Sequence, residues 1–162
     1  TFRIRRADPW IAAELADFAL EQWDEAYRGI LSDAALASRR AEPAASRRAR
    51  WEQRVEGGGV LVAEDSGGIV GVVRSEDIAD PRGPLLSSLV VSAAVRSRGI
   101  GAALVAAAVG DDPAHLWVFD GARRAQRFHE RQGFRFDGAR RLDTYGLELR
   151  MVRGHAPRAA RA

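Results

Sequence analysis

LVVSAAVRSRGIGAALV, residues 89–105, brings three local signals together in one short stretch. Apolar residues at 89–91 are typical of a strand, and Gly99 and Gly101 stand in a turn that leads into an apolar helical pattern. The first turn of a helix has backbone N–H groups without intrahelical partners and carries the positive end of the helix dipole. Glycines let a ligand approach that backbone closely. The order of strand, glycine turn and helix therefore predicts a cradle for phosphate groups.

Two common phosphate-binding motifs do not match this turn. A Walker loop requires Gly-Lys followed by Ser or Thr, and the chain contains no lysine. A dinucleotide fingerprint requires a third glycine near Leu104, and none is present there. The turn therefore indicates another kind of pyrophosphate-bearing ligand.

The motif Arg-x-x-Gly-x-Gly-Ala at 96–102, after a Leu-Val-Val strand, resembles the acyl-CoA pyrophosphate loop of the GNAT superfamily of N-acetyltransferases. A second stretch, LWVFDGARRAQRFHERQGF at 116–134, is similar to the family's next strand and helix, which end in an aromatic-x-x-x-x-Gly-Phe signature. The two stretches follow each other in the family's order. The resemblance implies an α/β (α+β) fold, with a mixed, mostly antiparallel sheet of about seven strands flanked by about four helices.

The resemblance also implies acetyl-CoA as cosubstrate and assigns its binding to the first stretch. Backbone N–H groups of the loop would bind the pyrophosphate, and Arg96 and Arg98 would add positive charge. Backbone groups of Leu89 and Val91 would pair with pantetheine, and an N–H near Val91 would polarise the thioester carbonyl. The full predicted cofactor site comprises Leu89, Val90, Val91, Arg96, Ser97, Arg98, Gly99, Ile100, Gly101 and Ala102.

The second stretch departs from the family pattern at two positions. The family often has an Asn that contacts pantetheine and a Tyr whose hydroxyl protonates the departing CoA thiolate. Here these positions are Ala122 and His129. His129 is therefore the candidate general acid, since a histidine can donate a proton or a neutral N–H. The alternative is a histidine that only lies at the surface or fills space.

The acceptor side carries weaker signals. Trp23 and Tyr27 lie in the segment that closes over the acceptor in the family, and aromatic and acidic residues there would suit a cationic amine. Core packing is the alternative for both rings. The strand before the loop has no carboxylate, so Glu76 and Asp77 are the nearest candidate bases, with solvated loop acids as the alternative and no base assigned.

Periodicity along the chain predicts one domain over 1–153 and a disordered tail over 154–162. The predicted strands are 2–5, 60–63, 69–73, 85–91, 116–119, 134–136 and 145–152. The first predicted helix begins at Pro9. A second helical stretch runs from Ser32 to about Val55 with an interruption at Pro43, and two further helices cover 100–109 and 121–132.

Composition narrows the function further. The net charge is only +3, and the isoelectric point is high because all 25 basic residues are arginine. Nucleic-acid binding is therefore not expected, although eleven arginines against four acids in 121–162 could form solvated helix faces or a basic rim for CoA. Without cysteine, thiol catalysis is excluded, and the three scattered histidines do not suggest a metal site. No apolar run approaches the roughly 20 residues of a membrane span, and TFRIRRADPW does not resemble a signal peptide, so a cytoplasmic protein is expected.

These observations favour an N-acetyltransferase that moves an acetyl group from acetyl-CoA to a primary amine by direct attack in a ternary complex. The expected acceptor is a small-molecule or peptide amine, and the sequence leaves its identity open. The first alternative is an acyl-CoA-binding protein with weak or no catalysis, because both the Asn and the Tyr positions are changed. The second is an arginine-rich interaction module, whose nucleic-acid binding would be sensitive to salt. The resemblance is also compatible with a homodimer that pairs through the C-terminal strand.

Overall fold

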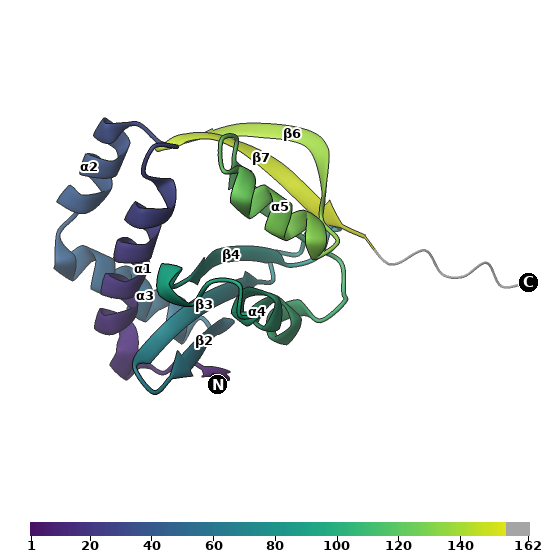
Figure 1. The fold of residues 1–162 in the computed structure, drawn as a ribbon. Coiled ribbons are helices and arrows are strands. Elements are labelled where there is room, and N and C mark those ends of the chain that lie inside the picture. Colours follow the sequence, from purple (N-terminus) through teal and green to yellow (C-terminus); the bar gives the residue numbers. More distant parts are fainter. Residues whose placement is uncertain (155–162) are drawn as a thin grey trace, which may run out of the picture.

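The computed structural model describes residues 1–154 and contains a single seven-stranded sheet (Figure 1). The strands are β1 (Arg3–Arg6), β2 (Val60–Asp65), β3 (Gly68–Glu76), β4 (Leu85–Val91), β5 (Ala114–Phe119), β6 (Arg135–Asp143) and β7 (Gly146–Arg153). The helices are α1 (Ala12–Tyr27), α2 (Asp33–Ala41), α3 (Ala44–Glu56), α4 (Ile100–Val109) and α5 (Arg123–Arg131). A short 3₁₀ turn at Pro9–Ile11 precedes α1, and a second one at Ala93–Val95 lies between β4 and α4.

The strand order is β1-β2-β3-β4-β5-β7-β6. The β4–β5 pair is parallel, and the other neighbouring pairs are antiparallel. This arrangement confirms the predicted mixed, mostly antiparallel sheet. Because β4 and β5 run in the same direction, they need a crossover connection, and α4 provides it.

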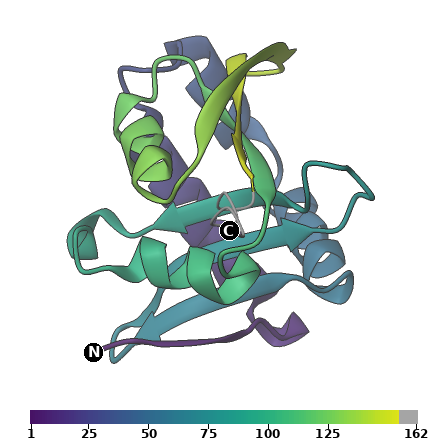
Figure 2. The ribbon, with the colours of Figure 1, turned by 90° about the vertical axis from the view of Figure 1, so that its right-hand side faces the viewer.

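Helices cover both faces of the sheet (Figure 1 and Figure 2). Alternation along β3 sends Val72 to the side of α1 and α3, where it packs with Leu15 and Trp51. Its neighbour Val73 packs on the other side with Leu104 of α4. Two apolar clusters therefore lie on opposite faces, and the strands between them are buried on both sides.

The number of helices differs from the prediction of about four. The predicted stretch from Ser32 to Val55 forms two helices, so that the described chain has five α-helices. Ser32 caps α2 as expected, and its hydroxyl accepts a hydrogen bond from the Ala35 amide at 3.1 Å. Pro43 then forces the preceding Glu42 into an extended conformation (ψ 131°), which ends α2 before α3 begins. The predicted tail lies, apart from Gly154, outside the described residues.

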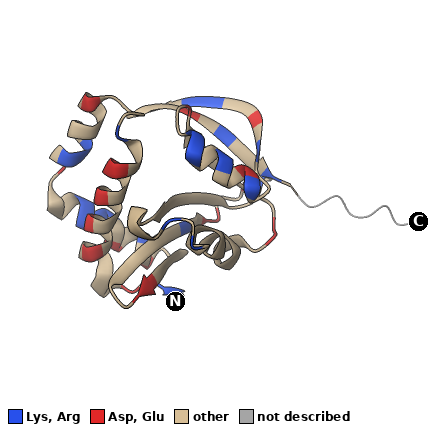
Figure 3. Cartoon of the chain, viewed as in Figure 1, with Lys and Arg blue, Asp and Glu red and all other residues tan. Residues whose placement is uncertain are grey.

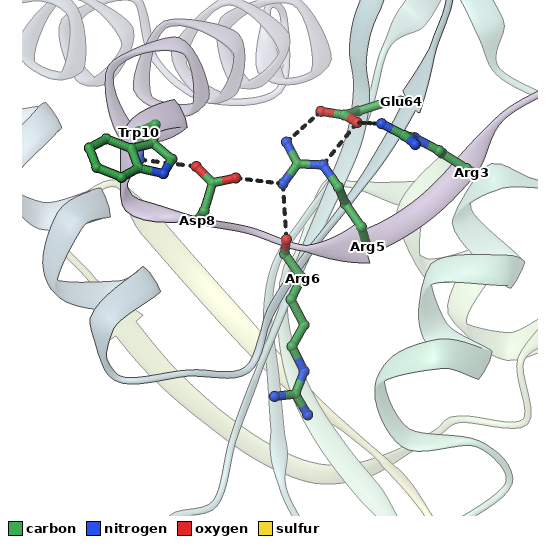
Figure 4. Close-up of polar contacts among 6 residues, drawn as sticks. All are labelled: Arg3, Arg5, Arg6, Asp8, Trp10 and Glu64. Carbon is green, nitrogen blue, oxygen red and sulfur yellow. Dashed lines mark hydrogen bonds and ion pairs between the residues drawn. The ribbon is translucent and has the colours of Figure 1, made fainter.

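A polar network fixes the start of α1 (Figure 4). The Arg5 guanidinium donates to both carboxylate oxygens of Glu64, at 2.9 and 2.7 Å, and also to Asp8 at 2.9 Å. The other Asp8 oxygen accepts from the backbone amide of Trp10, which caps the turn before α1 as the Asp8-Pro9 pair predicts. Hydrogen bonding to Arg5 also lowers the pKa of Glu64. The network therefore joins β1, β2 and the entry to α1.

We predict that Leu104→Ala destabilises the protein by roughly 2–5 kcal/mol, because Leu104 is fully buried and its removal leaves a cavity. Its side chain packs directly against Gly71: a Cβ added to Gly71 would lie 2.9 Å from Leu104 Cδ1. Urea unfolding followed by circular dichroism measures the change. The matched control is Leu142→Ala, since Leu142 is 85% exposed on the edge strand β6. Equal losses in the two variants would contradict the assignment of Leu104 to the core.

Candidate functional site

The two parallel strands β4 and β5 separate soon after they meet. They share one register pair, Leu85 with His115, and beyond it Val90 and Val91 pair only with β3. Within the described chain, the β4 edge that faces β5 is therefore free of strand partners from this point. Free backbone N–H and C=O groups on such an edge can pair with an extended ligand.

A bulge in β4 accompanies the separation. Val72 of β3 pairs with Val90 and Arg74 pairs with Ser87, so Ser88 and Leu89 lie opposite a single β3 residue. Ser88 adopts a left-handed conformation with a φ of 54°, which is uncommon for a residue with a side chain. A bulge bends its strand and increases the local twist. This bend directs the end of β4 away from β5.

A cavity of about 590 Å³ occupies the space opened by this separation. The end of β4, the C-terminal half of α1, the loop before α4 and one side of α5 surround it. The predicted site residues that line it are Trp23, Tyr27, Leu89, Val90, Val91, Arg96, Ser97, Gly99, Ile100, Gly101, Ala102 and His129. Arg98 does not line it, and its side chain is exposed.

The loop before α4 presents backbone donors to this cavity. Gly99 has a φ of 80° and Ser97 a φ of 68°, and no side chain caps the helix. The Ala103 amide donates to the Gly99 carbonyl at 3.0 Å, whereas the three preceding amides have no backbone partner within the described residues. A Cβ on Gly101 would lie 3.1 Å from the ring of Phe128. The donors and the lack of a side chain at Gly101 fit a bound diphosphate.

Charged side chains surround the loop. Arg96 donates to a Glu25 oxygen at 2.8 Å, and the Ala93 amide donates to Gln22 Oε1 at 2.9 Å. These contacts hold the loop against α1. Of the four arginines of α5, Arg124 and Arg131 line the cavity, and Figure 3 shows basic positions along this helix. The helix that faces the loop is therefore positively charged.

His129 lies largely buried at the cavity wall. Burial lowers the pKa of its imidazole to about 4. Its Nδ1 is buried and has no hydrogen-bond partner within the described chain. The ring is therefore neutral near pH 7 and retains hydrogen-bonding capacity for a ligand.

Trp23 and Tyr27 belong to an aromatic cluster with Phe119 and Tyr145. Trp23 is 5.0 Å from Tyr27 and 5.3 Å from Tyr145 between ring centroids, and Tyr27 is 5.1 Å from Phe119. Burial raises the pKa of the Tyr27 hydroxyl, and the nearby Glu148 raises it further. Both rings pack against the core and also line the cavity, so the two sequence interpretations are compatible.

The candidate bases named from the sequence do not line the cavity. Glu76 accepts from Ser87 Oγ at 3.1 Å and pairs with Arg74 at 3.0 Å. Asp77 is exposed and accepts from the Ala79 amide. Sequence reasoning missed the buried Glu148, whose pKa is raised by burial although Arg141 donates to it at 2.9 Å. The sequence shows the alternation of apolar and polar residues along β7, but only the pairing of β7 with β5 places Glu148 opposite Phe119.

The described residues contain neither a candidate metal site nor a candidate membrane-spanning helix. No group of three or more His, Asp or Glu side chains there is arranged to hold a metal ion. No helix in 1–154 is both long and apolar enough to cross a membrane.

A comparison of the sequence with protein-family models identifies the family of this chain. Residues 56–136, half of the chain, match the family model of the acetyltransferase (GNAT) domain. The chain therefore belongs to the GNAT acetyltransferase family. No curated protein matches the chain.

Solved structures share the fold at low sequence identity. The PaiA N-acetyltransferase of Thermoplasma acidophilum, solved in complex with coenzyme A, has a TM-score of 0.73 and 17% identity, over 96% of this chain and 99% of that one. PH1933 from Pyrococcus horikoshii has a TM-score of 0.71 and 20% identity, with the same coverage. The apo form of YjaB from Escherichia coli has a TM-score of 0.67 and 20% identity, again over 96% and 99%.

We predict that His129 makes the folded state sensitive to acid. Its pKa is lower in the folded chain, about 4, than the ordinary value of 6.5, so below pH 6.5 the unfolded chain binds more protons. Stability is then lost as the pH falls from about 6.5 to about 4, by roughly 3 kcal/mol in total. Urea unfolding of the wild type and of His129→Phe across this range measures the difference. A difference between the two proteins that stays constant with pH would contradict the lowered pKa.

Proposed function

We propose that this protein transfers an acetyl group from acetyl-CoA to a primary amine by direct attack in a ternary complex. The observation that carries this function is the separation of β4 from β5 beside the N-terminus of α4, within one cavity. A free strand edge suits an extended chain with amide groups, such as pantetheine. The neighbouring loop suits the diphosphate of the same molecule.

In this proposal, the amides at the start of α4 hold the pyrophosphate and Arg124 and Arg131 attract the anionic end of the cosubstrate. The edge of β4 from Leu89 to Val91 orients the acyl arm. A backbone N–H near Val91 donates to the thioester carbonyl oxygen, where negative charge develops during attack. These groups belong to a strand and a helix terminus, so they are in position before the reaction starts.

The transfer itself forms one bond and breaks one bond. The lone pair of a neutral amine attacks the thioester carbon, the new C–N bond forms, and the C–S bond breaks with its electron pair on sulfur. The nitrogen loses one proton and the CoA sulfur gains one. Neither Glu76 nor Asp77 lines the cavity, and the lining carboxylate of Glu25 is paired with Arg96, so in this proposal the acceptor enters as the free amine.

We assign His129 the role of a neutral hydrogen-bond donor to the departing sulfur. With a pKa of about 4, only about one imidazole in a thousand is protonated at pH 7. A charged imidazolium is therefore too rare to serve as the main proton source. A neutral ring N–H can still stabilise the thiolate until it takes a proton from water.

A second candidate function is acyl-CoA binding without efficient transfer. The observation in its favour is Ala122, which stands at the start of α5 where the family often has an Asn and which makes no side-chain cap. Losing one hydrogen bond to the cosubstrate costs about 0.5–1.5 kcal/mol. Release of free CoA thiol in the presence of an amine distinguishes the two functions.

We predict that acetyl-CoA stabilises the wild type by roughly 2.7 kcal/mol at 100 times its Kd, and that Gly101→Glu abolishes this effect. The substitution places a carboxylate among the phosphate donors, and its Cβ crowds Phe128. Thermal unfolding with and without acetyl-CoA measures the shift. The matched control is Ala106→Glu, which adds the same charge at an exposed position of α4. An unshifted wild type, or a shifted Gly101→Glu variant, would contradict the proposed cofactor site.

We predict that His129→Phe lowers kcat by about 10²-fold with little change in acetyl-CoA affinity, since it removes the donor but keeps the ring volume. Thiol release under saturating acetyl-CoA gives kcat, and the thermal shift gives binding. An unchanged kcat in a folded variant would remove His129 from the mechanism.

A further inference from the structure

Four arginines lie near one another around α3 and the end of α2. This arginine cluster consists of Arg39 from α2, Arg50 and Arg54 from α3, and Arg74 from β3. Burial, and after it the positive charges of the other three arginines, together lower the pKa of the Arg54 guanidinium to about 10. The four side chains are thus close enough to repel one another.

Carboxylates neutralise only half of this charge. Arg50 pairs with Glu42, and Arg74 pairs with Glu76 at 3.0 Å. Arg39 and Arg54 have no carboxylate partner within the described chain. Partly buried cations without counter-ions cost stability unless an anion joins them. The cluster therefore has two positive charges available for a ligand.

Aromatic rings hold these two free guanidinium groups in place. Arg39 lies over Trp23 at 4.9 Å and near Tyr145 at 5.9 Å, and Arg54 lies over Trp51 at 4.9 Å. Stacking fixes the plane of a guanidinium and leaves the N–H groups at its edge free to donate. The Nε atom of Arg39 is buried without a hydrogen-bond partner in the described residues, and the same is true of Arg74. A carboxylate or a phosphate can accept several such bonds at once.

The arginine cluster borders the point where β4 leaves β5. Arg54 Nη1 lies 3.4 Å from the hydroxyl of Ser88, the bulge residue. The next residue, Leu89, begins the strand edge that the proposed function assigns to the acyl arm. Tyr145, in the turn between β6 and β7, closes the other side, and Figure 1 shows this turn reaching toward α1 and α2. An anion in the cluster would thus sit beside the reacting end of the cosubstrate.

The features that suggested a cationic acceptor have partners inside the chain. The ring of Trp23 is covered by Arg39. Asp24 accepts from Arg28 at 3.3 Å and from Arg40 at 2.9 Å. Glu25 is paired with Arg96. These groups leave little attraction for a second cation.

We infer that the acceptor is a primary amine that also carries a carboxylate or a phosphate group, and that Arg39 and Arg54 bind this anionic group. The assignment rests on the proposed function for the identity of the reacting amine. The amine nitrogen then points toward Leu89, and the anionic oxygens remain with the guanidinium groups.

The test compares amines of similar size that differ in charge. β-Alanine and O-phosphoethanolamine carry the anionic group, ethanolamine lacks it, and 1,3-diaminopropane replaces it with a cation. Thermal unfolding at constant ionic strength, with CoA present to occupy the phosphate loop, measures binding. Thiol release with acetyl-CoA measures transfer. We expect the anionic amines to bind about 10- to 100-fold more tightly than ethanolamine, because hydrogen bonds to charged groups are involved.

Variants locate the effect. Arg39→Gln and Arg54→Gln should each remove most of the preference for anionic amines. Arg48→Gln is the matched control, since it removes the same charge from an exposed position of α3. If one of the two cluster variants does not fold, the other variant and the amine series measured on the wild type still test the inference.

The outcomes separate this inference from the proposed function. Equal binding of the anionic amines and ethanolamine, or a preference for anionic amines that survives both cluster variants, would overturn the anionic acceptor while transfer could still proceed. A preference that depends on Arg39 and Arg54 supports the anionic acceptor. The same preference without thiol release from any of the amines would support the anion site and overturn the transferase function.

Discussion

The separation of β4 from β5 is the constraint on which the rest of the site depends. Parallel strands that stay paired would satisfy each other's backbone groups and leave no edge for a ligand. Here one register pair holds the strands together, and the bulge at Ser88 bends β4 away. The crossover helix α4 then starts next to the open edge. The backbone donors of the strand and of the helix therefore converge on one cavity.

Much of the fold, including the glycine turn before α4, could be predicted because its signals are local. Gly99 and Gly101 lie within one turn of the strand and helix that they join, so a short stretch of sequence contains the whole motif. The break between α2 and α3 was visible as Pro43 but was interpreted as an interruption of one helix. Proline constrains the residue before it, and here that effect was strong enough to separate two helices.

The arginine cluster could not be predicted in the same way. Its members come from two helices and a strand. In the sequence, Arg39, Arg50 and Arg54 are part of a polar, arginine-rich stretch that is also typical of a solvated surface, and Arg74 directly follows an apolar strand. Which arginines turn inward depends on how α3 packs on the sheet through Trp51. Glu148 illustrates the same limit, since only the pairing of β7 with β5 and β6 buries its carboxylate.

The end of α1 has two neighbours at once. Gln22 and Glu25 hold the loop before α4, while Trp23 and Tyr27, on other sides of the same helical turns, pack into the aromatic cluster beside Arg39. A rigid helix cannot adjust to one neighbour without presenting a changed surface to the other. Under the proposed function, a shift of α1 on binding at the loop would also move its aromatic side, and any resulting coupling would be reciprocal: whatever one ligand does to the affinity of the second, the second does to the first.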